Sequence, residues 1–368
     1  MRIGIIGAGQ LGRMLALAGY PLGLRFTFLD PSADACGTQV GDSIVGAYDD
    51  PQQLQALANC VDVISFEFEN VPVDTLTNIA KRKPLFPPVN ALATSQDRLL
   101  EKNLFRTLGI ATPEFKAVDS LTDLHAAVSS LGLPGILKTR RLGYDGRGQY
   151  RLRTVKDIEA AWQALGGVPL IYEAFVPFTR EVSMIGVRSS KGETAFYPLT
   201  ENTHQNGVLH LSSAPFKNTT LQTQAERYLK KLFKQFNYVG VLTVEFFVLG
   251  GQLIANEMAP RVHNSGHWTI EGSETSQFEN HLRAICGLPL GSTALRGHVA
   301  MLNFVGHIPT SNAALQQNGV HFHDYGKQAR AGRKLGHATV VAGTPKARDL
   351  AVKKMLKLLP KTKSKATS

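Results

Sequence analysis

Residues 244–257, VEFFVLGGQLIANE, join two apolar stretches through a Gly-Gly pair. The pattern predicts an antiparallel hairpin that turns at Gly250-Gly251. Each arm carries one glutamate among apolar neighbours, Glu245 and Glu257, and such a carboxylate is costly unless a cation or a metal compensates its charge. Mg²⁺ accepts one or two carboxylates together with phosphate oxygens. The hairpin is therefore predicted to hold magnesium beside a phosphorylated ligand.

The register of this hairpin decides whether the two carboxylates can share a metal. A two-residue turn pairs Glu245 with Asn256 and sends Glu257 to the opposite face of the sheet. A three-residue loop or a one-residue bulge brings both glutamates to one face. We predict the loop or the bulge. A strict two-residue hairpin would instead favour glutamates held in salt bridges at a sheet edge.

A second candidate site lies at Lys138 and the glycine-rich segment that follows it. Lys138 ends a predicted strand from Gly135, and the loop Gly143-Tyr144-Asp145-Gly146-Arg147-Gly148 comes shortly after. Backbone N–H groups of such a loop can reach triphosphate oxygens, while the lysine stays a point charge on the strand. The loop lacks the Gly-Lys-Ser/Thr phosphate motif, which disfavours the common nucleotide-hydrolase folds. A surface hairpin with solvated arginines is the alternative.

The first glycine cluster of the chain, Gly7-x-Gly9-x-x-Gly12, stands near the amino terminus, with Asp30 about 20 residues further on. It falls between a predicted strand and a predicted helix, as a dinucleotide fingerprint requires. On its own it would indicate an NAD-dependent dehydrogenase. Any anion at a helix N-terminus uses the same geometry, however, so the motif leaves the ligand open.

Two polar segments near the carboxyl side are candidates for ligand binding. Residues 261–268, RVHNSGHW, crowd an arginine, two histidines and an asparagine into a stretch unlike a core strand. Residues 327–334, KQARAGRK, place four cations around a glycine, as a phosphate pocket needs. A solvated basic turn remains the alternative for the second segment.

The remaining pattern predicts a mixed α/β and α+β protein in three parts. Residues 1–94 open with a βαβ unit and form a Rossmann-like domain that ends in a proline-rich segment. Residues 95–292 combine strands with helices near 95–108, 155–165 and 221–236. Residues 293–368 turn to short strands and loops, a small β-rich domain with a lysine-rich tail.

Composition narrows the class of protein. The formal charge is +11, and part of it lies in six lysines between Lys353 and Lys365, a tail that is more typical of a solvated segment than of a nucleic-acid site. The rest of the charge suits an enzyme that handles phosphorylated anions. Three scattered cysteines indicate neither a disulfide framework nor a metal site. The short, glycine-broken apolar start and the lack of a long apolar run predict a cytoplasmic protein without membrane contact.

Taken in order, these segments resemble the 5-(carboxyamino)imidazole ribonucleotide synthases of purine biosynthesis, from the first residues to about residue 340. The most specific matches are residues 143–149, GYDGRGQ, and residues 256–269, NEMAPRVHNSGHWT. The resemblance implies an ATP-grasp fold behind a pre-ATP-grasp domain, with ATP held between two lobes. It also implies the reaction, in which ATP, bicarbonate and 5-aminoimidazole ribonucleotide give the carboxyamino product, ADP and phosphate. Enzymes of this kind are often homodimers.

The resemblance assigns residues by matching position. It implies ATP contacts at Arg98, Lys138, Gly143, Tyr144, Asp145, Gly146, Arg147, Gly148, Gln149, Glu173, Ala174, Phe175, Val176, Glu181, His204, Asn256 and Glu257. It implies ribonucleotide contacts at Gln10, Leu11, Glu67, Arg261, His263, Asn264, Lys327, Arg333 and Lys334. The metal ligands are Glu245 and Glu257, and the catalytic candidates are Lys138, Asp145, Arg261 and His263. Many ATP-grasp enzymes carry an asparagine at the position of Ala259, so here the metal is expected to rest on the two glutamates and water.

The implied chemistry leaves open which residue acts as the base and which alternatives to this function remain. Bicarbonate is a poor electrophile, so it is expected to take the γ-phosphoryl group and form a short-lived carboxyphosphate under a glycine-rich lid. Either Asp145 or His263 could then accept the proton of the substrate amine. The alternatives to this function are a sister ATP-grasp ligase such as a formate-using glycinamide ribonucleotide formyltransferase, the dehydrogenase, and a non-catalytic nucleotide sensor.

Overall fold

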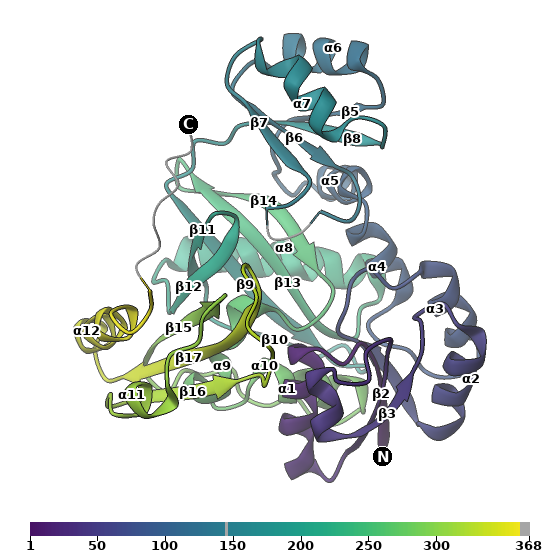
Figure 1. Ribbon diagram of the computed structural model, residues 1–368, viewed down its shortest axis with the longest axis vertical. Coiled ribbons are helices and arrows are strands. Elements are labelled where there is room, and N and C mark those ends of the chain that lie inside the picture. Colours follow the sequence, from purple (N-terminus) through teal and green to yellow (C-terminus); the bar gives the residue numbers. More distant parts are fainter. Residues whose placement is uncertain (144–145, 361–368) are drawn as a thin grey trace.

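The apolar run at the amino terminus forms an inner strand of a parallel sheet in the order β3-β2-β1-β4 (Figure 1). A computed structural model describes residues 1–143 and 146–360 of the chain. Because side chains alternate along a strand, Ile3 and Ile5 of β1 pack with helix α1 on one face, and Ile6 packs with helices α2 and α3 on the other. The elements are β1 (Arg2–Ile6), α1 (Gln10–Gly19), η1 (Tyr20–Leu22), β2 (Arg25–Asp30), η2 (Cys36–Val40), β3 (Asp42–Val45), α2 (Pro51–Cys60), β4 (Val63–Phe66) and α3 (Val73–Ala80). The predicted βαβ opening is confirmed.

Two short helices lead from this sheet to a small lobe. The predicted helix near residues 95–108 divides into α4 (Val89–Ser95) and α5 (Arg98–Thr107), because Asp97 caps the N-terminus of α5 by accepting from the amides of Leu99 and Leu100. The small lobe is an antiparallel sheet in the order β5-β8-β6-β7, and α6 and α7 cover one of its faces. Its elements are β5 (Phe115–Val118), α6 (Leu121–Leu131), β6 (Gly135–Thr139), β7 (Gln149–Leu152), α7 (Asp157–Leu165) and β8 (Leu170–Ala174).

The largest unit is one continuous sheet in the order β14-β13-β9-β11-β12-β15-β17-β16, with β10 beside β9. Helix α8 packs against β9 and β14, and α10 lies between this sheet and α1. The strands are β9 (Arg180–Arg188), β10 (Thr194–Phe196), β11 (Thr200–Gln205), β12 (Val208–Ala214), β13 (Gly240–Leu249), β14 (Gln252–Ala259), β15 (His298–Val305), β16 (Val320–Asp324) and β17 (Lys334–Ala342). The helices are α8 (Thr219–Phe236), η3 (Asn264–Gly266), α9 (Thr269–Gly272), α10 (Gln277–Ile285), α11 (Ser311–Leu315) and α12 (Pro345–Leu356).

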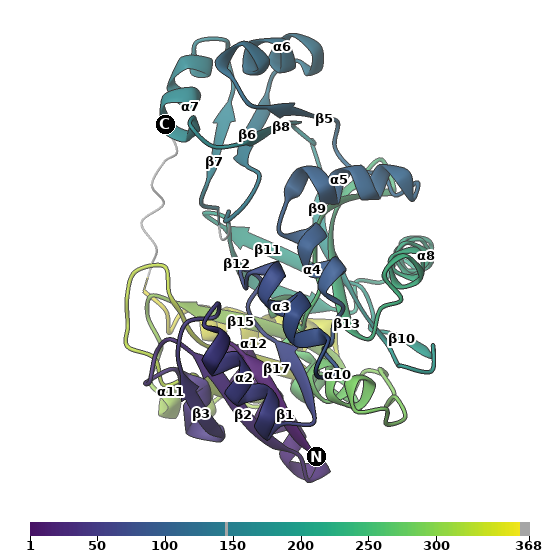
Figure 2. The ribbon, with the colours of Figure 1, turned by 90° about the vertical axis from the view of Figure 1, so that its right-hand side faces the viewer.

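The three parts are not equally separate. One apolar core contains Leu15 of α1 and Phe26 of β2 together with Trp268, Phe278 and Met301 of the large unit. The strands after residue 293 pair through β15 with β12, so they extend the large sheet rather than build a sheet of their own. Figure 2 shows the small lobe standing away from these two units. The division at residues 94 and 292 remains a prediction about domains.

Two further features bear on the sequence predictions. The hairpin of β11 and β12 was not predicted, because its many polar residues do not give the apolar run or alternation that indicates a strand. Within residues 1–143 and 146–360, no helix combines the length and the apolar character needed to cross a membrane.

Candidate active site

The hairpin of β13 and β14 brings the two predicted metal ligands face to face. Leu249 pairs with Gln252, so Gly250-Gly251 is a two-residue turn, but the register shifts between Glu245 and Phe246. Beyond this bulge Glu245 pairs directly with Glu257. The extra residue is Asn256, and if it paired regularly with Glu245, Glu257 would point to the other face of the sheet. The predicted bulge is confirmed.

Glu245 and Glu257 have different charged neighbours, so their pKa values shift in opposite directions. Burial, and next the Glu257 carboxylate, raise the pKa of Glu245 to about 7. Burial would also raise the pKa of Glu257, but Arg98, whose Nη1 lies 3.0 Å from Glu257 Oε2, holds it below the usual value. Two carboxylates this close repel each other unless a proton or a cation lies between them, and the donor set suits Mg²⁺. The described residues contain no group of three or more metal-ligating side chains, so phosphate and water would complete the coordination.

The raised pKa of Glu245 predicts a pH dependence of the metal-free protein. Between pH 4.5, the ordinary pKa of a glutamate, and about 7, the folded protein holds a proton that the unfolded chain has lost. The free energy of unfolding therefore falls as the pH rises through this window, by at most about 1.4 kcal/mol per pH unit for this proton. Thermal melting between about pH 5 and pH 8 measures this slope.

Glu245→Gln is the control for this prediction, because it removes the titrating group and should flatten the profile. Added Mg²⁺ should stabilise the wild type more at high pH than at low pH, since at low pH the ion must displace the proton. Identical profiles for the two proteins would contradict the assignment.

A buried group of charges lies at the floor of the small lobe. The Nζ atom of Lys138 lies 2.9 Å from Glu173 Oε2, and the Nζ of Lys102 lies 3.6 Å from the same oxygen. Burial would raise the pKa of Glu173, but Lys102, Lys138 and Arg98 hold it at about 2. Lys102 also donates to the backbone carbonyl of Asn256, at 2.7 Å. Lys138 and Glu173, which the sequence predicted to contact ATP, therefore form one network with the hairpin of β13 and β14.

Lys102 and its neighbour Glu101 were not predicted as site residues. Both are almost fully buried, and Glu101 accepts from the backbone N–H of Met258 on β14, at 2.6 Å. The available signal was their position on α5, because Arg98, Glu101, Lys102 and Phe105 recur at helical spacing on its buried face.

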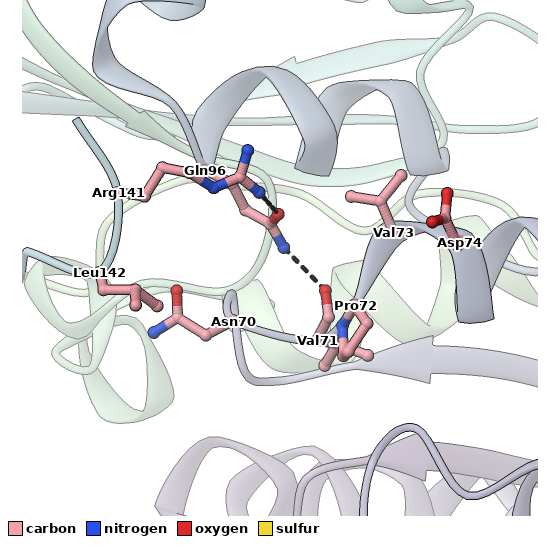
Figure 3. A pocket seen from close by; sticks show the side chains of 8 residues that line it. All are labelled: Asn70, Val71, Pro72, Val73, Asp74, Gln96, Arg141 and Leu142. Atoms are coloured by element: carbon pink, nitrogen blue, oxygen red, sulfur yellow. Dashed lines mark hydrogen bonds between the residues drawn. The ribbon is translucent and has the colours of Figure 1, made fainter. Parts of the chain in front are cut away.

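Three consecutive residues between α4 and α5 hold the start of the glycine loop. Gln96 accepts from Arg141 at 2.7 Å and donates to the carbonyls of Glu69 and Val71. Figure 3 shows the bonds of Gln96 to Arg141 and Val71. Asp97 accepts from Nε and Nη2 of Arg140. Arg98 reaches the carbonyl of Gly143 at 3.4 Å, so it contacts both the loop and Glu257. Tyr144 and Asp145 lie outside the described residues.

The other predicted ATP residues fall in two places. Glu181 on β9 and His204 on β11 form an ion pair at 2.9 Å. Burial would lower the pKa of His204, but Glu181, Glu245 and Glu257 raise it above the usual value. The segment from Glu173 to Val176 ends β8 and connects the small lobe to the large sheet.

The first glycine cluster does not fit a dinucleotide. The backbone N–H groups of Gly9 and Gly12 donate to the Glu67 carboxylate, at 2.8 and 3.2 Å. Ala8 donates to Asp30, at 2.8 Å. The amides that would bind a pyrophosphate therefore already hold carboxylates of the protein, which excludes the dehydrogenase reading.

Gly9→Ala tests this internal anion site. The Gly9 backbone suits any residue, with φ −77°, but an added Cβ would lie 2.6 Å from Glu67 Oε1. The carboxylate would have to leave the amides, so we expect a loss of about 1–3 kcal/mol in the free energy of unfolding, measured by denaturant melting. Gly343→Ala is the control, because nothing lies within 4 Å of its added Cβ. Equal stability of the two variants would contradict the close approach.

The predicted ribonucleotide residues come together from all three parts of the chain. Lys327 donates to Gln10, and the charges of Lys327 and Arg261 act on buried Glu67. Arg261 pairs with Glu69 at 3.0 Å, a residue that was not predicted. Arg333 and Lys334 are half-buried, whereas Arg330 of the same basic turn is exposed, and Leu11 is buried in the core.

Residues 261–264 hold polar atoms without partners. Among the described residues, Arg261 Nε and both amide atoms of Asn264 find no hydrogen-bond partner although they are buried. His263 Nε2 lies 3.5 Å from Glu245 Oε1. Burial, followed by Arg261 and Lys334, lowers the pKa of His263 well below its usual range. Buried groups of this kind indicate a polar ligand, and the cations indicate an anion.

A tyrosine joins the segments that carry these side chains. The Tyr325 hydroxyl lies 2.7 Å from His337 Nδ1 and 3.2 Å from His267 Nδ1. All three residues are buried. Tyr325 precedes Lys327, His267 follows Asn264 and His337 follows Lys334, so this contact fixes three ligand-bearing segments relative to one another.

Three family models match consecutive parts of the chain. The ribonucleotide synthetase preATP-grasp domain covers residues 1–96, the ATP-grasp domain covers residues 103–278, and the phosphoribosylaminoimidazole carboxylase C-terminal domain covers residues 299–349. The N5-carboxyaminoimidazole ribonucleotide synthase of Pseudomonas aeruginosa is 54% identical over 340 residues, which are 92% of this chain and 94% of that protein. The protein of the same name from Bacillus subtilis is 38% identical over 345 residues, 92% and 90% of the two chains.

Solved structures agree over the whole described fold. The N5-carboxyaminoimidazole ribonucleotide synthetase of Thermus thermophilus is 52% identical, with a TM-score of 0.94, and the match covers 97% of this chain and 98% of that one. An Aspergillus clavatus N5-carboxyaminoimidazole synthase in complex with ADP and 5-aminoimidazole ribonucleotide is 30% identical, with a TM-score of 0.91 and coverage of 97% and 98%.

Proposed function

Because the chain belongs to the N5-carboxyaminoimidazole ribonucleotide synthase family, we propose that its cleft uses bicarbonate and magnesium-bound ATP to carboxylate its substrate amine. The protein is an ATP-grasp ligase that carboxylates 5-aminoimidazole ribonucleotide at the expense of ATP in purine biosynthesis. The observation that carries the proposal is the bulge that sets Glu245 opposite Glu257, with Arg98 beside them.

ATP binds in this family, as the ATP complex of the Aspergillus clavatus enzyme indicates. We assign the triphosphate of this chain to Arg98, Lys138 and the loop of residues 143–149, because these cations converge on the metal hairpin. We assign adenosine binding to residues 173–176, which connect the two lobes, and to Glu181 with His204.

The metal would be held by Glu245 and Glu257. When bound there, Mg²⁺ would neutralise charge that spreads over the transferring phosphoryl oxygens. Arg98 and Lys138 are placed to stabilise the same charge, since both reach the cleft from buried networks. Attack of a bicarbonate oxygen on the γ-phosphorus breaks the bond to ADP and yields carboxyphosphate.

The second step joins the substrate amine to the activated carboxyl carbon and releases phosphate. The cationic cluster of Arg261, Lys327, Arg333 and Lys334 would bind the ribonucleotide phosphate and carboxyphosphate, and the unpartnered Asn264 amide would orient one of them. Gln10 and Glu67 close this pocket from the first sheet. Asp145 is the candidate base, although it lies outside the described residues.

We also propose a cytosolic homodimer. The three cysteines are unpaired, as expected in a reducing compartment. Leu17 and Tyr20 expose 46% and 45% of their surface on α1 and η1, and Leu288 exposes 38% just after α10, which packs against α1. Sedimentation of the wild type and of Leu17→Asp tests this surface, since a dimer held there would dissociate in the variant.

The deciding experiment measures ADP release with Mg-ATP and bicarbonate, with and without 5-aminoimidazole ribonucleotide. ADP release that depends on the ribonucleotide and on bicarbonate is the expected result. ADP release that needs formate in place of bicarbonate would favour a sister ligase. An absence of ADP release in every condition would favour a nucleotide sensor and contradict the proposal.

A further inference from the structure

The hydrogen bonds of His263 define where its ring proton lies. His263 caps the turn η3, and its Nδ1 accepts from the backbone N–H of Ser265 at 3.2 Å. A backbone N–H can only donate, so Nδ1 must present its lone pair. The ring proton then sits on Nε2, the nitrogen that faces Glu245. A second proton on Nδ1 would point at the amide hydrogen, which also excludes the imidazolium in this geometry.

A row of buried side chains supports the same arrangement. Ser265 Oγ lies 2.9 Å from His263 Nδ1, and Ser183 Oγ donates to Ser265 Oγ at 2.8 Å. Asn202 Nδ2 donates to Ser183 Oγ at 3.0 Å, and Ser212 donates to Asn202 Oδ1 at 2.8 Å. We call Ser265, Ser183, Asn202 and Ser212 the serine relay. Its members come from η3, β9, β11 and β12, and all are buried.

The direction of the relay follows from its donors. Ser183 accepts from the Asn202 amide, so its own hydrogen goes to Ser265. Ser265 then receives one hydrogen and gives its own to His263 Nδ1. Gln277 fixes the backbone of His263 from the other side, because it accepts from the His263 N–H at 3.0 Å and donates to its carbonyl at 2.6 Å. Both the ring and its backbone are therefore held.

We propose that the serine relay fixes His263 as a hydrogen-bond donor through Nε2–H, aimed at an oxygen of the bicarbonate-derived group beside Glu245. His263 is then not the base that accepts the amine proton, since its lone pair faces the protein and not the cleft. The relay residues are positioning residues that act through the imidazole. The donor's target rests on the proposed function, whereas its tautomer does not.

The tautomer is tested on the ligand-free protein. Labelling with ¹⁵N-histidine and recording long-range ¹H–¹⁵N correlations distinguishes a protonated from an unprotonated ring nitrogen, and His263→Gln identifies the signal of His263. We expect an unprotonated Nδ1 and a protonated Nε2. The opposite assignment would overturn the proposal whatever reaction the enzyme catalyses.

The donor role is tested by two replacements of the same residue. His263→Gln keeps an N–H near the position of Nε2 but has no basic nitrogen, and His263→Ala has neither. We expect His263→Ala to lose about 10²–10³-fold in kcat, as for the removal of an oxyanion donor, and His263→Gln to recover at least tenfold of this loss. Equal losses in the two variants, with both folded, would overturn the donor role.

The relay itself is tested by Ser183→Ala, with Ser189→Ala as the matched control. Ser189 is a buried serine just beyond the same strand, but its hydroxyl accepts from Glu193 and lies outside the relay. Ser183→Ala should lower kcat about tenfold with an unchanged KM for ATP, and it should broaden or shift the His263 ring signals. If Ser183→Ala matches Ser189→Ala in kcat and in the His263 signals, the relay does not position the imidazole.

Asn202→Asp is a second variant for this test, because it keeps the shape of the side chain but cannot donate to Ser183. The hydrogen of Ser183 would turn toward the new carboxylate, and the row would lose its direction. The same changes in kcat and in the ring signals are expected. Wild-type values of both would contradict the direction assigned to the relay.

Discussion

Glu257→Gln is expected to lower ribonucleotide-dependent ADP release by about 10³-fold, because metal stabilisation of the transferring phosphoryl group contributes several kcal/mol. Glu257 is a proposed metal ligand, and it also contacts Arg98, a proposed triphosphate contact, at 3.0 Å. The neutral amide would weaken metal binding and leave the half-buried guanidinium of Arg98 without its counter-charge. Initial rates over a range of Mg²⁺ concentrations measure the effect.

Glu279→Gln provides the matched control for this prediction. Glu279 forms an ion pair with Arg283 on the same helix, α10, and is not one of the proposed site residues, so the wild-type rate is expected. The loss in Glu257→Gln should shrink at high Mg²⁺ if the metal is only weakened. A rate within tenfold of wild type at low Mg²⁺ would remove Glu257 from the metal site.

Lys102→Met is expected to give the largest loss of stability, about 3–5 kcal/mol in the free energy of unfolding. Its ammonium is fully buried, and it compensates Glu173 and donates to the carbonyls of Ala255 and Asn256. Removing it takes a donor from these buried acceptors and leaves Lys138 and Arg98 to balance the charge of Glu173. Denaturant unfolding measures the loss, and the affinity for ATP should fall with it.

Lys231→Met is the control for the buried charge. Lys231 donates to the carbonyl of Leu108 at 2.6 Å from a half-buried position, and within the described part of the chain it has no carboxylate partner. Its loss should cost about 1 kcal/mol. A Lys102→Met protein no less stable than this control would mean that Glu173 does not depend on the second lysine.

Local patterns explain what the sequence could predict. The βαβ opening and the carboxylate hairpin follow from periodicity, glycines and turn length, and these act over a few residues. A longer loop or a bulge was predicted only because two buried glutamates required one face, and the structure has the bulge, at Asn256. The need to place two carboxylates on one face thus predicted a backbone irregularity that strand propensity alone does not predict.

The unpredicted parts depend on contacts between distant segments. Lys102 meets the carbonyl of Asn256 across 154 residues, and Ser183 meets Ser265 across 82. The sequence next to a serine on a strand or a lysine on a helix does not indicate such a distant partner. The first glycine cluster misled for the same reason, since Glu67, 58 residues beyond Gly9, takes the place of a ligand phosphate.

The continuity of the large sheet has a consequence for the order in which the products leave. The hairpin with Glu245 and Glu257 and the strand that follows the basic turn belong to one hydrogen-bonded sheet, and the first sheet shares its core. The chain enters and leaves the small lobe, which carries Lys138 and Glu173, around residues 108–114 and 175–179. The side chains of Gln96, Asp97, Arg98 and Lys102 contact the lobe from outside it. A swing of the small lobe would therefore free ADP while every ribonucleotide contact stays in place. We expect ADP to depart first, and the carboxylated nucleotide to remain bound until its own pocket exchanges it.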